Sequence, residues 1–338
     1  MRPHFLRDLL LTVAVLAAIP LLISNSYIFD VVIRIGLAAV AVIGLNILMG
    51  LAGQISIGHA AFVAGAAYTS AILTSVYHWP TIAAIPVSVA AMTVLALLLA
   101  APMLRLNGHA LTIATLGLGL IVQIVLVNEV AWTGGPDGLA TAPLTIGSLA
   151  INTDMRWYAV VATVLLIAMT LSRNLDRSAA GRALRTVRDS EIAAAAAGID
   201  TYWLKVRAFV VAAAFAGIAG ALSGHYTGFI TPDMTSFLKN VELATMVVVG
   251  GRGSTLGAVL GAVLLTALPE LLGGYADYEM IAFGLILMMT MIFLPNGIVP
   301  SIATKLQALK YTRGSDAKAN AARNPQFDEA VRWTEGGQ

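Results

Sequence analysis

Long apolar stretches separated by short polar or Gly/Pro breaks constrain this chain more than any other feature. Lipid offers no partners for backbone N–H and C=O groups, so such stretches are predicted to be membrane-spanning helices. The charged share is 11% of 338 residues, against about 25% in an ordinary soluble domain. Because a crossing takes about 20 apolar residues, no room remains for a soluble catalytic domain. We predict an all-α, polytopic membrane protein.

Ten spans account for the apolar stretches. The eighth covers about ten residues, too few to cross alone, so it is predicted to be a broken helix or a re-entrant segment. The first span follows Arg2 and Arg7 and could instead be a signal peptide. The predicted spans are residues 9–23, 31–49, 56–77, 81–104, 110–131, 157–171, 205–229, 241–250, 255–272 and 278–294.

The distribution of basic residues sets the predicted orientation. With both termini in the cytoplasm, all of the 20 Lys and Arg residues lie on the cytoplasmic side except three, which are Arg34, Arg156 and Lys239. Such an excess of inner cations is the rule for polytopic membrane proteins. The formal net charge of +2 is too small to indicate a nucleic acid partner.

The predicted domain organisation follows from the spans. Residues 1–300 form a transmembrane domain, with an outer loop at 132–156 and a cytoplasmic loop at about 173–204. Residues 301–338 form a polar cytoplasmic tail, which is predicted to be disordered because it has few large apolar residues.

Several classes of function leave no trace in the sequence. The glycine-rich stretch at 250–257 lacks the Gly-Lys-Ser/Thr ending of a phosphate-binding loop, and no Gly-x-Ser-x-Gly nucleophile motif is present. The five histidines are scattered and there is no cysteine, so we predict no metal site and no catalytic residue. Glu129, Glu242 and Glu270 fall near span ends, which weakens the case for a proton- or ion-driven carrier.

The cytoplasmic loop is predicted to form one or two short amphipathic helices. Its alanine run ends at Gly198, a natural helix-ending residue, and Asp200 or Thr201 can cap the next helix. Leu184, Val187, Ile192 and the alanines supply apolar surface. A basic loop of this kind could bind lipid headgroups or dock into another protein that drives the seventh span. The predicted docking residues are Arg182, Arg185, Arg188, Asp189, Glu191 and Gly198.

Three stretches give the chain a family resemblance. They are residues 45–62, LNILMGLAGQISIGHAAF; residues 182–194, RALRTVRDSEIAA, with Gly198 beyond; and residues 215–222, FAGIAGAL, with the glycines between 250 and 261. With these motifs in this order, the chain resembles the permease subunits of branched-chain amino-acid ABC transporters, in particular the longer permease. The likeness extends over most of residues 31–300.

The resemblance implies a complex in the bacterial inner membrane. Its partners would be a second permease subunit, two ATPase subunits and a periplasmic substrate-binding protein. ATP and Mg would bind to the ATPase subunits, with no cofactor on this chain. The 182–198 loop would contact an ATPase, although its Glu191 is followed by Ile192 and Gly198 comes seven residues after the Glu, where importers of this class typically have Glu-Ala-Ala and a spacing of six.

Polar residues between the second and third spans are candidates for the substrate pathway. They could form an interfacial turn that satisfies helix ends, or they could line a gate, in which Asn46 and Gln54 would bind a zwitterion through their amides. These candidates are Asn46, Gln54, Ser56 and His59. Glycines at close-packing positions are predicted to join helices, and they are Gly58, Gly65, Gly220, Gly224, Gly253, Gly257 and Gly261.

The predicted function is a non-catalytic permease that moves branched-chain amino acids inward, driven by ATP hydrolysis on partner chains. Because closely similar permeases carry urea or short amides, such an importer is the alternative. A stand-alone secondary carrier is the rival from another class.

Overall fold

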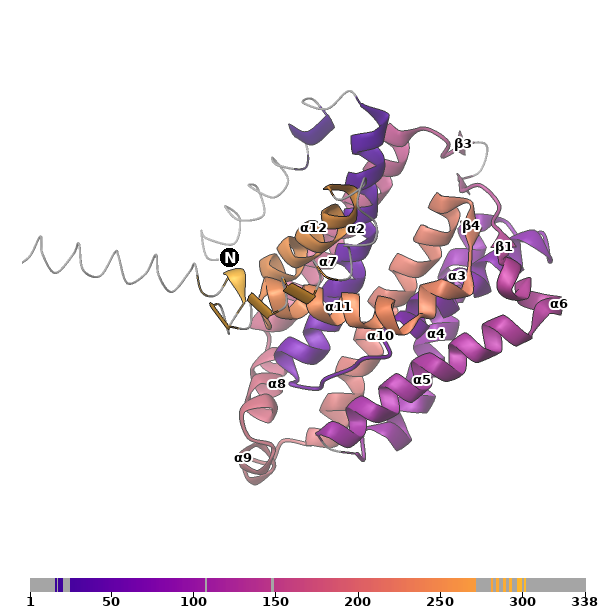
Figure 1. The fold of residues 1–338 in the computed structure, drawn as a ribbon. Helices are drawn as coiled ribbons and strands as arrows, with labels where there is room; N and C mark the ends of the chain where they lie inside the picture. Colours follow the sequence, from indigo (N-terminus) through magenta and orange to yellow (C-terminus); the bar gives the residue numbers. More distant parts are fainter. Residues whose placement is uncertain are drawn as a thin grey trace, which may run out of the picture.

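The computed structural model describes residues 25–106, 108–146 and 149–271, together with residues 16 and 18–20 and scattered positions between 281 and 301. The predicted first and tenth spans lie mostly, and the predicted tail almost entirely, outside the described residues. Elsewhere the fold is α-helical, as predicted, with two short β-ladders (Figure 1).

Eight of the predicted spans correspond to helices in the described part of the chain. These helices are α2 (Ser26–Asn46), α3 (Ala60–Ser75), α4 (Thr81–Met103), α5 (His109–Asn128), α7 (Asp154–Arg177), α10 (Thr201–Thr227), α11 (Phe237–Gly250) and α12 (Thr255–Leu271). Two short helices, α8 (Ala179–Asp189) and α9 (Glu191–Ala196), lie between α7 and α10.

The connection between α5 and α7 holds most of the remaining structure. It contains α6 (Val130–Thr133), a 3₁₀ turn (Gly135–Asp137) and the strands β1 (Leu139–Ala140), β2 (Thr145–Ile146) and β3 (Leu149–Ala150). Strand β1 pairs antiparallel with β4 (Phe229–Ile230), and β2 pairs with β3. A second 3₁₀ turn, Pro232–Thr235, precedes α11.

Five described helices are long and apolar enough to cross a membrane. They are α2 with its π-helical continuation Ile47–Leu51, α4, α5, α7 and α10. The apolar helices α3 and α12 are shorter. Helix α11 has 14 residues, about 21 Å at 1.5 Å per residue, so it falls short of a crossing on its own, as predicted for the eighth span.

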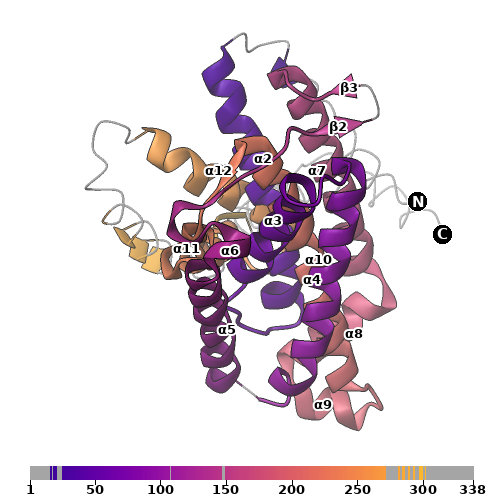
Figure 2. The same ribbon diagram turned by 90° about the vertical axis from the view of Figure 1, so that its right-hand side faces the viewer.

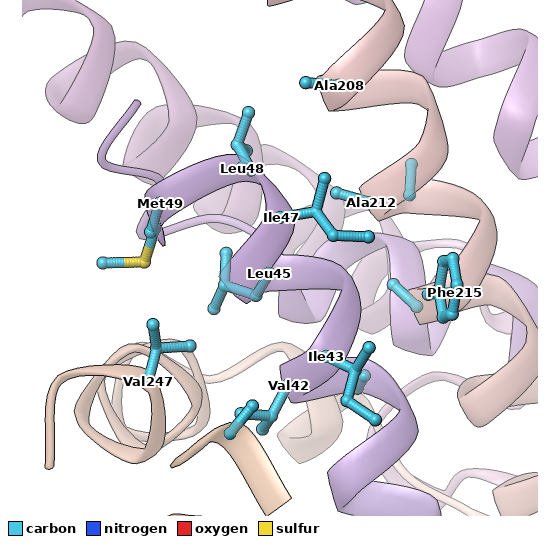
Figure 3. Packing of buried hydrophobic residues seen from close by; sticks show 14 of the residues in the cluster. Val42, Ile43, Leu45, Ile47, Leu48, Met49, Ala208, Ala212, Phe215 and Val247 are labelled. Carbon is cyan, nitrogen blue, oxygen red and sulfur yellow. The ribbon is translucent and has the colours of Figure 1, made fainter. Parts of the chain in front are cut away.

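Small residues let α10 pack closely at the centre of the molecule. Its neighbours are α2, α3 and α4, and Figure 3 shows Ala208, Ala212 and Phe215 of α10 facing the end of α2, with Val247 of α11 close by. Close approach of helices through Ala and Gly maximises van der Waals contact, which is what holds helices together in lipid.

Helices α4 and α5 instead expose large apolar side chains. Leu98 of α4 and Ile113 and Ile121 of α5 are each at least 60% exposed. Surfaces of this kind are unfavourable in water and suit contact with lipid or with another membrane protein. The described fold is therefore that of a polytopic membrane protein.

The helices meet at two distinct ends. At the α8–α9 end, the Tyr202 hydroxyl of α10 donates to the carbonyl of Ala101, which brings the start of α10 beside the end of α4. At the opposite end, the Thr81 hydroxyl donates to the carbonyl of Thr145 at 3.0 Å, beside the β2–β3 ladder. Figure 2 shows α8 and α9 at one end of the molecule and β2 and β3 at the other.

Two stretches differ locally from the sequence-based expectation. Helix α3 begins at Ala60, four residues later than the predicted span, because the preceding segment is non-helical. The predicted loop at 173–204 is largely helical, since α7 continues to Arg177 and is followed directly by α8 and α9. The expectation of one or two short helices in this loop is therefore confirmed, with two present.

Candidate functional site

Local capping explains why α8 and α9 form as separate helices. The hydroxyl of Ser178 accepts from the N–H of Gly181, and that of Ser190 accepts from the N–H of Ala193, so each helix has its own N-cap. Helix α9 ends at Ala196, and Gly198 follows its C-cap residue with a φ of +78°, which glycine adopts readily. Asp200 then caps α10 by accepting from the N–H of Trp203, as the sequence predicted.

The inner face of α8 is fastened to the end of α2. Leu184 and Val187 are buried there. The guanidinium of Arg188 donates to the carbonyl of Gly50 at 2.9 Å, in the π-helical continuation of α2. A methyl group at Gly53 would lie 2.6 Å from Cγ of Arg188. Helix α8 therefore rests directly on the point where the α2 helix stops.

The start of α9 is fastened to α10 by an ion pair. Nζ of Lys205 lies 2.6 Å from Oε1 of Glu191, and the Lys205 side chain is 3% exposed while that of Glu191 is 41% exposed. A buried ammonium without a partner is strongly unfavourable, so this pair fixes α9 against α10. In the sequence, Lys205 is one of the basic residues predicted to lie on the cytoplasmic side, and no local pattern indicates that it is the partner of Glu191.

The other predicted docking residues have different positions. Arg185 pairs with Asp176 at the end of α7, and Arg182 donates to the carbonyl of Arg177. Asp189 accepts from Arg188 at 3.0 Å. Ile192, expected to share an apolar face with Leu184 and Val187, is instead 87% exposed because it lies on α9, beyond the break at Ser190.

A non-helical segment, residues 52–59, separates the end of α2 from α3. Its first part lies against Arg188, and its last residue, His59, bonds through Nε2 to the carbonyl of Ala212 at 3.0 Å. Ala212 is near the middle of α10. Irregular backbone at membrane depth is tolerated where protein or an aqueous cavity surrounds it. The segment therefore runs from the α8–α9 end into the interior of the bundle.

Asn240 of α11 supports the start of α3. Its side-chain oxygen accepts from the N–H of Ala60 at 3.0 Å, and its amide nitrogen donates to the carbonyls of Thr235 and Ser236. The side chain is buried, and both its oxygen and its nitrogen are hydrogen-bonded. Asn240 was not among the predicted site residues, because in the sequence it is simply a polar residue at the start of a short apolar stretch.

Asn46 and Gln54 occupy different environments. Asn46 is 2% exposed and joins α2 to the turn between α11 and α12: it accepts from the N–H of Gly253 at 2.8 Å and donates to the carbonyl of Ser254 at 3.2 Å. Gln54 is partly buried and donates to the carbonyl of Ala52 at 3.4 Å. The Asn46 amide thus satisfies helix-end groups on another element, and its contact with substrate stays a prediction.

Ser56 and His59 each carry a polar atom without a partner in the described part of the chain. Oγ of Ser56 and Nδ1 of His59 are both fully buried. Buried polar groups are nearly always hydrogen-bonded, so an unpartnered one needs an explanation. A water molecule, a solute or a rearranged backbone would supply the missing bonds, which keeps residues 52–59 as a candidate part of the pathway.

Most of the predicted packing glycines lie where two backbone segments approach closely, and they differ in how well they would tolerate a methyl group. A methyl group at Gly58 would overlap the Thr115 carbonyl, and one at Gly220 would overlap that of Val63. At Gly65 the nearest atom is Sδ of a flexible Met92 side chain, and at Gly224 the nearest atom is 3.3 Å away. Gly257 and Gly261 of α12 face carbonyls of α11, while Gly253 has a φ of +80° in the turn between these helices.

A cavity of about 370 Å³ opens among α2, α3, α10, α11 and α12. Arg34, Lys239, Glu242 and Glu270 line it, so two of the three cations assigned to the outer side by the sequence gather in one place. The cavity also touches Ala60, the first residue of α3, and Met246. None of the predicted pathway residues is part of its lining.

Comparison with known proteins agrees with this architecture. A family model described as the permease component of the branched-chain amino acid transport system matches residues 27–295. The chain is 32% identical over 289 residues to the high-affinity branched-chain amino acid transport system permease protein LivM of Salmonella typhimurium and to that of Escherichia coli, covering 78% of this chain and 68% of each relative. No solved structure matches the chain significantly.

The chain is also similar to a second permease protein, LivH, of the high-affinity branched-chain amino acid transport system. The match with LivH of Salmonella typhimurium has 28% identity over 188 residues, covering 53% of this chain and 61% of the relative. The range matched by the family model spans α2 to α12 and includes α8 and α9.

Proposed function

Because this chain belongs to the family of branched-chain amino acid transport permeases, we propose that it carries branched-chain amino acids inward as the non-catalytic permease subunit of an ABC importer. The observation that carries the proposal is the family match over residues 27–295. The α8–α9 pair, fastened at once to the end of α2 and to α10, supports it.

The proposed complex lies in the bacterial inner membrane with the α8–α9 end in the cytoplasm. Its other members are a second permease, two ATPase subunits and a periplasmic binding protein that delivers the amino acid. The similarity to both LivM and LivH supports a pair of permeases. ATP and Mg bind to the ATPase subunits and not to this chain.

The coupling route runs from α9 into the bundle. Ile192, which is 87% exposed, presents an apolar side chain for the ATPase to bury. Movement of α9 passes to α10 through the Glu191–Lys205 pair, and movement of α8 passes through Arg188 to Gly50, directly before the segment 52–59. ATP-driven movement at the surface therefore reaches the irregular backbone inside the membrane domain.

Reconstitution into liposomes tests the proposal. The purified chain alone should show no concentrative uptake of leucine under a proton or sodium gradient. Uptake should require the partner permease, the ATPases, the binding protein and ATP together, since the driving force comes from the partner chains. Concentration of leucine by this chain alone would contradict the ABC assignment, and uptake of urea but not leucine would contradict the substrate class.

A further inference from the structure

The cavity among α2, α10, α11 and α12 has a regular construction. Each of these helices contributes residues spaced three or four positions apart, so that one face of each helix forms a wall. On α2 these residues are Arg34, Leu37, Ala38 and Ala41, and on α11 they are Lys239, Glu242, Leu243 and Met246. The helices α2, α11 and α12 lie together in Figure 1. The cavity therefore lies between helix faces that come from distant parts of the sequence.

The lining combines charged and apolar residues. On α2, charged Arg34 lies nearer the start of the helix than the apolar residues Leu37, Ala38 and Ala41. The lining also includes Ala60, where the segment 52–59 gives way to α3. The cavity thus offers both charged and apolar surface and reaches the residue that directly follows the irregular backbone of the pathway.

The charges that line the cavity balance. Arg34 and Lys239 are cationic, and Glu242 and Glu270 are anionic. A balanced set gives little net attraction to an ion, whereas a zwitterion finds an opposite charge for each of its two groups. A neutral amide would gain hydrogen bonds but no ionic contact. The charge pattern therefore favours a zwitterionic amino acid over a simple ion and over a neutral amide.

Arg34 is prepared to bind a carboxylate. Its Nε donates to Asp30 at 2.8 Å, and Tyr226 holds the other oxygen of Asp30 through its hydroxyl at 2.6 Å. The Arg34 side chain is 52% exposed, and within the described residues its bond to Asp30 uses Nε and leaves the two terminal guanidinium nitrogens available. Asp30 and Tyr226 thus orient the guanidinium, and its terminal nitrogens match the two oxygens of a carboxylate.

Glu242 is prepared to bind an ammonium group. Its side chain is 18% exposed and pairs through Oε2 with Lys239 at 2.7 Å. The Lys239 side chain is 57% exposed, so water screens that pair and the second carboxylate oxygen can take another cation. Leu37, Leu243 and Met246 supply apolar surface in the same cavity for an aliphatic side chain. The volume of about 370 Å³ lies in the range of small-molecule sites.

We propose that this cavity is a binding site for one zwitterionic amino acid with an aliphatic side chain, held by Arg34 at its carboxylate and by Glu242 at its ammonium group. Leu37, Leu243 and Met246 contact the side chain of the amino acid. The site receives the solute before it reaches residues 52–59. This assignment rests on the proposed function and specifies where that function first handles its substrate.

Transport by the complete reconstituted complex tests the two charged contacts. Leucine uptake is measured with saturating leucine-loaded binding protein, so that capture by the binding protein does not limit the rate. Arg34→Gln and Glu242→Gln should each lower uptake by about tenfold or more, because each removes a charged hydrogen-bond partner. Assembly of the complex should stay at the unsubstituted level.

Matched variants separate binding from folding. Arg156→Gln removes a cation that bonds the Ala150 carbonyl at the same end of the bundle but does not line the cavity, so its uptake should stay within about twofold. Arg34→Lys keeps the charge without the paired terminal nitrogens and should recover part of the uptake.

Thiol labelling provides a second measurement. The chain has no cysteine, so Ser223→Cys places a single thiol in the cavity wall and Met155→Cys places one on the exposed start of α7. Leucine should slow labelling at position 223 and leave labelling at position 155 unchanged. 4-Methylpentanoate, which lacks the ammonium group, and isoamylamine, which lacks the carboxylate, should protect poorly.

The outcomes distinguish this proposal from the proposed function. Leucine uptake by Arg34→Gln and Glu242→Gln at the level of Arg156→Gln, or labelling at position 223 that leucine does not slow, would overturn the cavity assignment alone. Absence of leucine uptake by the unsubstituted complex would overturn the proposed function and this assignment together.

Discussion

The ion pairs at the α8–α9 end and those beside the cavity differ in what they join. At the α8–α9 end, Lys205 of α10 pairs with Glu191 of α9 and Arg185 of α8 pairs with Asp176 of α7, so these pairs join different helices. Beside the cavity, the ion pairs Asp30–Arg34 and Lys239–Glu242 join residues three or four positions apart on one helix. Bonds between elements transmit movement, whereas bonds within a helix leave side chains able to exchange partners with a solute.

The largest effect is expected at the fastened end, from Glu191→Lys. The change removes the partner of buried Lys205 and adds a like charge. We expect ATP-driven uptake to fall at least about tenfold, because breaking a buried ion pair costs roughly 3 kcal/mol. This cost is at the lower end of the range for such pairs, since the Glu191 side chain is partly exposed. Uptake and membrane insertion are measured in the same preparation. Normal uptake would show that the pair does not connect α9 to α10 functionally.

A smaller effect is expected from Ile192→Asp on the outer side of α9. The residue is 87% exposed in this chain, so the thermal stability of the isolated permease should not change. Affinity for the ATPase should fall by roughly 1.5–3 kcal/mol, the value of burying a large aliphatic side chain. Binding of the purified ATPase is measured directly. Ile192→Leu is the control and should bind normally; equal binding by both variants would exclude Ile192 from the interface.

Asn46→Leu tests whether that amide acts as a structural joint or as a substrate contact. It leaves the N–H of Gly253 and the carbonyl of Ser254 without their partner, which costs about 1–3 kcal/mol. Thermal unfolding in nanodiscs should move to lower temperature, and the KM for loaded binding protein should stay the same. Gln54→Leu, which loses one long hydrogen bond, should be milder. A raised KM with unchanged stability would instead favour the pathway role.

The smallest effect is expected from Tyr27→Phe at the cavity end. Tyr27 is 55% exposed and donates its hydroxyl to Glu270. Losing this exposed bond should change stability by less than about 1 kcal/mol. Thermal unfolding checks the prediction, with Arg156→Gln as a second exposed change. A large loss of stability would mean that the cavity end is fastened as firmly as the α8–α9 end.

Local properties of the sequence determined the fold class and the two short helices α8 and α9. Apolar length predicted helices in lipid, and Ser178, Ser190, Gly198 and Asp200 set the helix ends, because each acts through neighbours within a few residues. The boundary of α3 was less predictable, since Asn240, 180 residues away, supports its first N–H group.

Tertiary structure alone decided which residues meet. Arg34 and Glu242 read in the sequence as charges near span ends, and the cavity exists because α2 and α11 pack with these faces toward each other. Likewise the sequence showed Glu191 and Ile192 as adjacent residues, while the fold turned Glu191 toward Lys205 and left Ile192 exposed. Helix formation depends on nearby residues, whereas helix packing depends on surfaces that come from distant parts of the chain.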